Sequence, residues 1–294
     1  MTHQLPQTLL RLALLLILAA TSLAAQAKVF LWEAERDGQR IWLLGSIHLG
    51  RADLYPLPAA IEAAYKEADT LAVEADISDP VAFVPLTAMA MLPAEQSLGS
   101  MLSPAQNRQL NQALARVNLP RVAADRMKPW LLALTLGVLE MQRLGFQPQN
   151  GIDMHFLQRA RSDRKKVLEL ESVKAQFELF DSLTQEESLN FLLSTLEPIN
   201  KQQLKPMLEA TMSAWQRGDA NALRRVIDDA MPNDPLSRRL NDKLLGQRNR
   251  TMADKIASMA AARPPLVVVG AGHLAGDDSV LELLKTRGFR IKQY

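Results

Sequence analysis

Two histidines follow a glycine at the same spacing, near opposite ends of the chain. His48 lies in "IWLLGSIHLG" and His273 in "LVVVGAGHLAG". The chain has only 13 glycines and four histidines in 294 residues, so far fewer than one such spacing is expected by chance. Glycine permits turns and close approaches closed to other residues, so Gly45 and Gly270 can direct each ring back over its strand. Imidazoles bind metals and exchange protons near neutral pH. The pair therefore predicts a metal or acid-base site, the alternative being buried, hydrogen-bonded rings that close two turns.

Acidic residues also follow apolar stretches. Glu74 comes after "TLAV" and Glu171 after "KVLEL". In open α/β sheets ligands bind beyond the carboxyl ends of the strands, and a carboxylate there costs free energy unless it is paired or bound to a cation. Glu169 competes with Glu171, and either carboxylate could instead hold an arginine. Asp153 in "GIDMHF" is either a catalytic carboxylate or a favourable charge in the first turn of a helix.

The remaining candidates are polar groups in a predicted helix. Arg248 and Asn249 lie in "QRNR", where the arginine could supply a positive charge to an oxyanion. His155 does not share a helix face with Asp153, two residues earlier, so we interpret it as a surface or packing residue. The chain has no cysteine, which excludes thiolate catalysis and leaves His, Asp, Glu and water as metal ligands. It also lacks a Gly-x-Ser-x-Gly elbow, a Gly-rich phosphate loop and a His-Glu-x-x-His helix.

Short apolar runs and longer helical patterns must position these residues. The predicted strands are Ile41 to Leu44, Thr70 to Val73, Lys166 to Leu170 and Leu266 to Val269, with weaker candidates at Val29 to Trp32 and Phe289 to Lys292. The predicted helices start at Pro58 and at the capping boxes of Ser103 and Thr184, and they continue through Lys201 to Arg217, Ala220 to Ala230 and Pro235 to Ala262. This alternation predicts an α/β fold with a mainly parallel central sheet.

The first 27 residues have the pattern of a secretory signal peptide. Arg11 precedes an apolar run, and Ala25-Gln26-Ala27 offers a cleavage site. We expect cleavage after Ala27 and a periplasmic or secreted protein with no membrane span; the alternative is an uncleaved anchor. The remaining 267 residues carry 33 basic and 32 acidic side chains, a balance that argues against nucleic acid as a partner.

No linker or internal repeat divides the rest of the chain. We therefore expect one α/β domain over residues 28–294, with large helical insertions at about 79–165 and 172–262.

The sequence resembles the TraB/GumN family, which is related to the TIKI proteins. The resemblance rests on the two Gly-x-x-His turns with the segments that flank them, and on the motifs "KPW", "GIDMHF", "KVLELES" and "QRN". It implies an α/β fold shared with erythromycin-esterase-like and ChaN-like proteins. In TIKI members it implies a metal-dependent proteolytic activity that favours manganese or cobalt. The family's paired histidines fall on His48 and His273 and its early acidic residue on Glu74, whereas Ser46 replaces a threonine that many members have.

The leading hypothesis is a periplasmic metal-dependent hydrolase that cleaves a peptide bond. His48, Glu74 and His273 would bind one divalent cation, with Asp153 and Glu171 as further candidate ligands and Arg248 at the oxyanion. Zinc and iron suit this ligand set as well as manganese and cobalt. The alternatives are a metal-independent His/Glu hydrolase and a non-catalytic protein that binds a peptide or haem. The substrate, a peptide or other small molecule, and the oligomeric state are not determined by the sequence.

Overall fold

The computed structural model describes residues 28–78, 83–230, 234–259 and 263–294, so the predicted leader at residues 1–27 lies outside the described residues. Six strands form one sheet in the order β4-β3-β5-β2-β1-β6. Their bounds are β1 Leu31–Arg36, β2 Gln39–Ser46, β3 Thr70–Val73, β4 Lys166–Glu169, β5 Leu266–Gly270 and β6 Arg290–Gln293.

The four strands β4, β3, β5 and β2 are mutually parallel. The central strand β5 is buried along its whole length, as expected for a continuous apolar run covered on both faces. Ser46 of β2 lies opposite Gly270 of β5, and Val73 of β3 lies opposite Glu169 of β4. The carboxyl ends of all four strands therefore meet at one edge of the sheet.

The sheet is completed by antiparallel pairing at its other side. β1 and β2 form a hairpin whose turn residues, Asp37 and Gly38, both have positive φ angles, of 55° and 79°. Such angles suit the right-handed twist of a two-residue hairpin. β6 pairs antiparallel with β1, which joins the two ends of the described chain. The predicted α/β fold with a mainly parallel sheet and helical insertions is confirmed. Both weaker strand candidates overlap a strand, although β1 begins at Leu31 and extends to Arg36, beyond the predicted end at Trp32.

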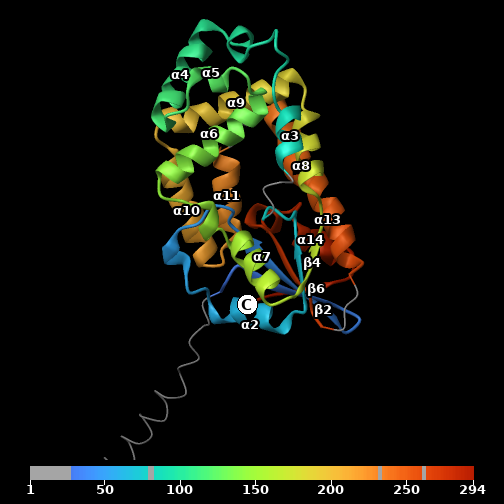
Figure 1. Ribbon diagram of the computed structural model, residues 1–294. Helices are drawn as coiled ribbons and strands as arrows, with labels where there is room; N and C mark the ends of the chain where they lie inside the picture. The colour runs from blue at the N-terminus through green and yellow to red at the C-terminus, as the bar shows by residue number, and fades with distance from the viewer. Residues whose placement is uncertain (1–27, 79–82, 231–233, 260–262) are drawn as a thin grey trace, which may run out of the picture.

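Helices cover the sheet and rise above its carboxyl edge (Figure 1). Close to the sheet, α7 packs on β3 and β4, and α14 packs on β6. The α-helices are α2 Ala59–Glu67, α3 Val84–Met89, α4 Pro104–Val117, α5 Arg121–Ala124, α6 Pro129–Arg143, α7 Ile152–Ser162, α8 Val173–Asp181, α9 Gln185–Asn200, α10 Leu204–Gln216, α11 Ala220–Ala230, α12 Pro235–Asn241, α13 Gln247–Ala257 and α14 Val280–Thr286.

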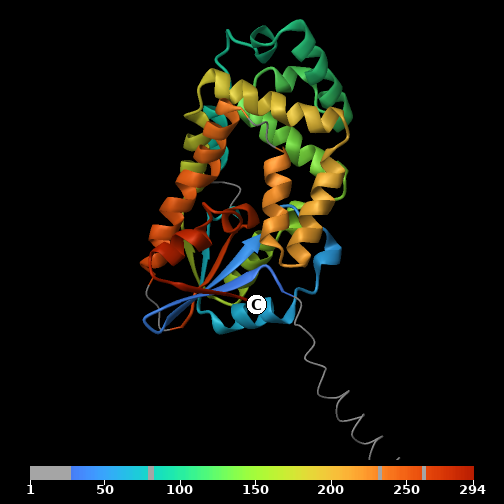
Figure 2. The ribbon, with the colours of Figure 1, turned by 180° about the vertical axis from the view of Figure 1, so that it is seen from behind.

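The helical region has an apolar core of its own. Leu110 of α4, Leu132 and Leu136 of α6, and Leu192 and Leu196 of α9 belong to one buried cluster, separate from the cluster around the sheet. The two views in Figures 1 and 2 show α6 and α9 above the carboxyl edge, with α10 and α11 on one side and α13 on the other. The insertions thus form an arch over the strand ends.

Two predicted helices differ in detail from the structure. The pattern from Lys201 contains a break, since Gln202 has a φ of 57° and α10 begins only at Leu204. The pattern from Pro235 contains a π-helical turn, Asp242–Gly246, between α12 and α13, and α13 ends at Ala257. Residues 260–262 at the end of that prediction lie outside the described residues. In the part of the chain that the structure describes, no helix is long and apolar enough to cross a bilayer.

Candidate active site

The parallel strands bring four chemically active side chains to one edge of the sheet. Glu171 follows β4, Glu74 follows β3, His273 follows β5 and His48 follows β2. Because these strands are neighbours in the order β4-β3-β5-β2, the four residues are delivered side by side although they come from distant parts of the chain. This is the position at which open α/β sheets bind ligands.

Gly270 lies at the centre of this group. A Cβ atom placed on Gly270 would be 3.1 Å from Glu74 Oε1, 3.4 Å from His48 Nε2 and 3.6 Å from His273 Cδ2. Two imidazoles and one carboxylate therefore surround the space that a side chain at this position would occupy. A glycine keeps that space open.

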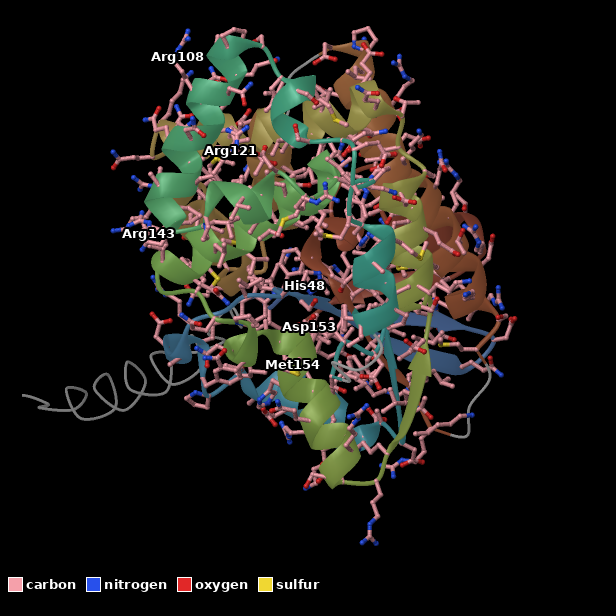
Figure 3. All side chains as sticks on the ribbon, turned by 45° about the horizontal axis from the view of Figure 1, so that its top comes forward. His48, Arg108, Arg121, Arg143, Asp153 and Met154 are labelled. Atoms are coloured by element: carbon pink, nitrogen blue, oxygen red, sulfur yellow. The ribbon has the colours of Figure 1, made fainter. Side chains whose placement is uncertain are left out.

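His48 is held by Asp153, from the first turn of α7. The imidazole Nδ1 and Asp153 Oδ2 are 2.6 Å apart, and Figure 3 shows the two residues together at the start of that helix. The approach needs Gly151, whose Cβ would lie 2.2 Å from the backbone oxygen of His48. The His48 side chain is 55% exposed, so its Nε2 edge is accessible. The negative charge of Asp153 and its hydrogen bond to Nδ1 raise the pKa of His48 to about 9.

His273 has a different partner and a different protonation state. Its Nδ1 lies 2.6 Å from Asn249 Oδ1, and Asn249 Nδ2 donates to the backbone oxygen of Asp278 over 2.8 Å. The second bond fixes the amide with its oxygen toward the ring, so Nδ1 carries the proton and Nε2 presents a lone pair. Burial lowers the pKa of His273, which therefore stays neutral near pH 7. Its Nε2 lies 3.6 Å from Glu74 Oε1.

Glu74 is a buried, ionised carboxylate. Oε1 accepts a hydrogen bond from the Gly270 N–H over 2.6 Å, and Oε2 accepts one from Arg248 Nη2 over 2.6 Å. Burial by itself would raise the pKa of Glu74, but His273, His48 and Arg248, together with the Gly270 N–H, lower it to about 2. Since His273 is neutral near pH 7, the charges that keep Glu74 ionised there are those of His48 and Arg248.

Arg248 joins the two glutamates. Its Nε and Nη2 donate to Glu171, and Nη1 donates to the backbone oxygen of Leu244 in the π-helical turn. Of the two glutamates that the sequence left open, Glu171 is thus the one that holds an arginine. Glu169 instead accepts a hydrogen bond from the Asp76 N–H.

Gln176 of α8 completes the cluster and was missed by sequence reasoning. Its Nε2 lies 3.4 Å from Glu74 Oε2 and 3.2 Å from Glu171 Oε2. The sequence does contain a signal for Gln176, because this residue lies in the second turn of the helix that starts after Glu171. A polar side chain there lies close to the strand ends.

A cavity of about 180 Å³ opens beside His48 and Glu74. Ser46, Asp153 and Gln176 contribute polar groups to its wall, and Val73, Ala75, Ile77 and Val268 contribute apolar ones. Ser46 Oγ and Asp153 Oδ1 are both buried without a hydrogen-bond partner. A small group with one polar end matches this lining, because buried polar atoms are otherwise almost always paired.

The residues present are chemically suited to a divalent cation. In the described part of the chain, no set of three or more His, Asp or Glu side chains already has metal-binding geometry. When two ligand atoms each lie about 2.1 Å from one metal ion in tetrahedral geometry, they are roughly 3.4 Å from each other. This separation is close to the 3.6 Å between His273 Nε2 and Glu74 Oε1. Both rings are oriented through Nδ1 by an oxygen, as is usual for metal-binding histidines. Binding of a cation by these donors would require His48 to give up its second proton and the ligands to draw together.

The structure thus groups most of the predicted site residues and separates one of them. His48, Glu74, Asp153, Glu171, Arg248, Asn249, Gly270 and His273 form one connected cluster. Gly45 is not part of it: a Cβ there would lie 2.3 Å from the Phe30 ring, so this glycine serves core packing. His155 packs against the rings of Tyr55 and Phe156, which matches its interpretation as a packing residue.

Comparison with known proteins adds a family and named relatives. The sequence model of the TraB/PrgY/gumN family matches residues 30–293. The chain is 31% identical over 269 residues to the uncharacterised protein YbaP of Escherichia coli, covering 87% of this chain and 97% of YbaP. It is 22% identical over 309 residues to metalloprotease TIKI1 of Danio rerio, covering 90% of this chain. The matched region spans 62% of that TIKI1 chain. No solved structure matches significantly.

Proposed function

We propose that this chain, which belongs to the TraB/PrgY/gumN family, is a divalent-metal-dependent hydrolase of the periplasm that cleaves peptide bonds. The observation that carries the proposal is the meeting of His48 Nε2, Glu74 Oε1 and His273 around the open space at Gly270. The metalloprotease name of the TIKI relatives supports the reaction type. The leader pattern of residues 1–27 supports the location.

His48, Glu74 and His273 would hold the cation. When bound, it would supply a Lewis acid that polarises the scissile carbonyl and makes a water more acidic. Two nitrogen ligands and one carboxylate suit manganese, cobalt, zinc or iron, and manganese or cobalt is favoured by the resemblance to TIKI proteins.

The other residues of the cluster position these ligands. Asp153 and Asn249 fix the two rings, while Arg248 and Gln176 fix the outer oxygen of Glu74. Glu171 holds Arg248 in turn. Because its guanidinium is committed to two carboxylates and a backbone oxygen, we assign Arg248 to the orientation of Glu74 as well as to the charge of the site.

A water that attacks a peptide carbonyl needs a proton acceptor. Of the three carboxylates in the described cluster, Asp153 is the one with an oxygen, Oδ1, that accepts no hydrogen bond. We therefore assign Asp153 as this acceptor, in addition to its contact with His48.

Metal content and peptide cleavage test the proposal together. We expect purified protein to retain close to one divalent ion per chain and to cleave members of a peptide library, with activity lost on chelation and restored by manganese or cobalt. His48→Ala and His273→Ala should abolish metal retention, whereas His155→Ala, which removes an imidazole outside the cluster, should leave it intact. Unchanged metal content in His48→Ala would refute the proposed ligand set.

A metal-free hydrolase is a second candidate, favoured by one specific contact. Asp153 gives His48 a pKa of about 9, which makes the ring a cationic acid near neutral pH beside the ionised Glu74. Cleavage that survives chelation and disappears in both His48→Ala and Glu74→Gln would support this candidate over the first.

A further inference from the structure

A second cavity, of about 260 Å³, lies in the helical arch and plays no part in the proposed chemistry. It is lined by residues of α6, α9, α10, α11, α12 and the π-helical turn. Its wall is mainly apolar and includes Phe191, Ile199, Met207, Ile227, Leu240 and Leu244. Pockets that enclose whole drug-sized ligands measure about 300–1,000 Å³. This cavity is therefore sized for one apolar group and not for a peptide.

Gly137 makes room for the cavity from α6. It lies in the interior of that helix, where glycine is unfavourable compared with alanine. A Cβ atom at Gly137 would have no neighbour within 4 Å, so no packing contact requires a glycine there. Filling the position would reduce the cavity without a clash.

The cavity wall touches the turns that carry the candidate site. The Cδ1 atom of Ile227 lies 3.3 Å from the Cβ position of Gly272, the residue before His273. The backbone oxygen of Leu244 accepts the hydrogen bond from Arg248 Nη1. Figure 2 shows α11 and α13 on the two sides of the turn that carries His273, with α6 and α9 above. The cavity wall is thus in direct contact with the elements that carry His273 and Arg248.

The two cavities have complementary chemistry. The one beside His48 has an imidazole, two carboxylates, a hydroxyl and an amide in its wall beside four apolar residues, and these polar groups suit a scissile peptide group, whereas the wall of the arch cavity presents mostly carbon atoms. We propose that the arch cavity binds a large apolar side chain of the substrate, of leucine to phenylalanine size, while the peptide bond lies at Gly270. This inference rests on the proposed function and names a substrate class for it.

Binding to metal-free protein tests the cavity without any turnover. The probes are N-acetyl-phenylalanine methylamide and its glycine counterpart, titrated while the methyl resonances of Met207 and Ile227 are followed by NMR. We expect the phenylalanine compound to shift both methyls and to bind wild type at least tenfold more tightly than the glycine compound. Gly137→Leu should remove this difference. Gly137→Ala, the matched control, adds one methyl and should retain most of it.

The same variants then report on selectivity. The substrates are a peptide that wild type cleaves, with a large apolar residue at the position that enters the cavity, and the same peptide with alanine at that position. Gly137→Leu should lower kcat/KM about tenfold for the first peptide and leave kcat/KM for the second unchanged. Losses of this size are typical when a methylene or two no longer fits an apolar pocket. Thr195→Leu fills the cavity from α9 and should act alike if Gly137→Leu fails to fold.

The outcomes separate this inference from the proposed function. Probe binding that Gly137→Leu and Thr195→Leu leave unchanged, or that shifts neither methyl, overturns the cavity assignment even if the protein cleaves peptides. Absence of metal-dependent cleavage overturns the proposed function, while cavity binding by the probe still supports an apolar ligand site there.

Discussion

The two imidazoles of the candidate site differ in protonation because the charge of Asp153 raises the pKa of His48, whereas burial lowers the pKa of His273. A carboxylate, Asp153, stabilises the cationic form of His48, whereas a neutral amide, Asn249, contacts the buried ring of His273. At neutral pH one ring is therefore a cation and the other offers a free lone pair. A metal ion must displace a proton from the first ring and none from the second.

Metal affinity should therefore depend on pH through His48. With a pKa of about 9, the ring is protonated below that pH, so affinity should rise about tenfold per pH unit between pH 7 and 9. In Asp153→Asn the largest cause of the raised pKa is gone, so affinity should level off at a lower pH than in wild type, toward the ordinary histidine value of roughly 6.5. Competition with a metal-sensitive dye across this range measures both curves. A flat wild-type curve from pH 7 to 9 would contradict the assignment, and His155→Ala should reproduce the wild-type slope.

At the scale of elements, a hydrogen bond links α10 to the end of β2, the strand that precedes His48. Trp215 of α10 is buried, and its indole Nε1 donates to the backbone oxygen of Gly45 over 2.7 Å. Because that oxygen is buried, no water molecule can replace the indole as its hydrogen-bond donor. A buried hydrogen bond, as well as packing, thus holds α10 to this strand end.

Removing that hydrogen bond should lower the stability of the fold. In Trp215→Phe the Gly45 oxygen loses its partner, which costs about 1–3 kcal/mol of unfolding free energy, with a further loss from the smaller ring. Trp42→Phe is the matched control, since its indole donates to Glu67, whose side chain is 33% exposed and can bond to water instead. Urea unfolding measures both variants. Equal losses would show that the buried bond is not what distinguishes Trp215.

At the scale of the whole molecule, the candidate site exists only in the folded chain. Its ligands come from residues 48, 74 and 273, and the paired strands β1 and β6 join residues near the two ends of the described chain. An unfolded chain cannot bring these ligands together. A cation that binds them therefore favours the folded state.

Added metal should consequently stabilise the protein in a concentration-dependent way. At a free metal concentration one hundred times the dissociation constant, the expected gain is about 2.7 kcal/mol. Thermal unfolding at increasing manganese or cobalt concentrations measures this gain as a rising midpoint. His273→Ala should show almost no rise. A rise of wild-type size in that variant would point to a metal site elsewhere in the chain.

The sequence by itself determined much of the sheet and the kinds of residue at its edge. Apolar runs that end in a glycine or a carboxylate are local signals, and they located the strands before His48, Glu74, Glu171 and His273. The Asp37-Gly38 pair is an equally local hairpin signal, which the sequence reasoning did not use. Capping boxes at Ser103 and Thr184 were present as predicted, because a cap needs only four consecutive residues.

Only the tertiary structure decided which side chains meet. The choice of Glu171 over Glu169 for Arg248, the orientation of His48 by Asp153, and the inclusion of Gln176 all join residues from separate elements. The order β4-β3-β5-β2 sets these meetings, and it follows from how helices and strands pack. Contacts between distant residues depend on the summed packing of the whole chain, so no local pattern of residues encodes them.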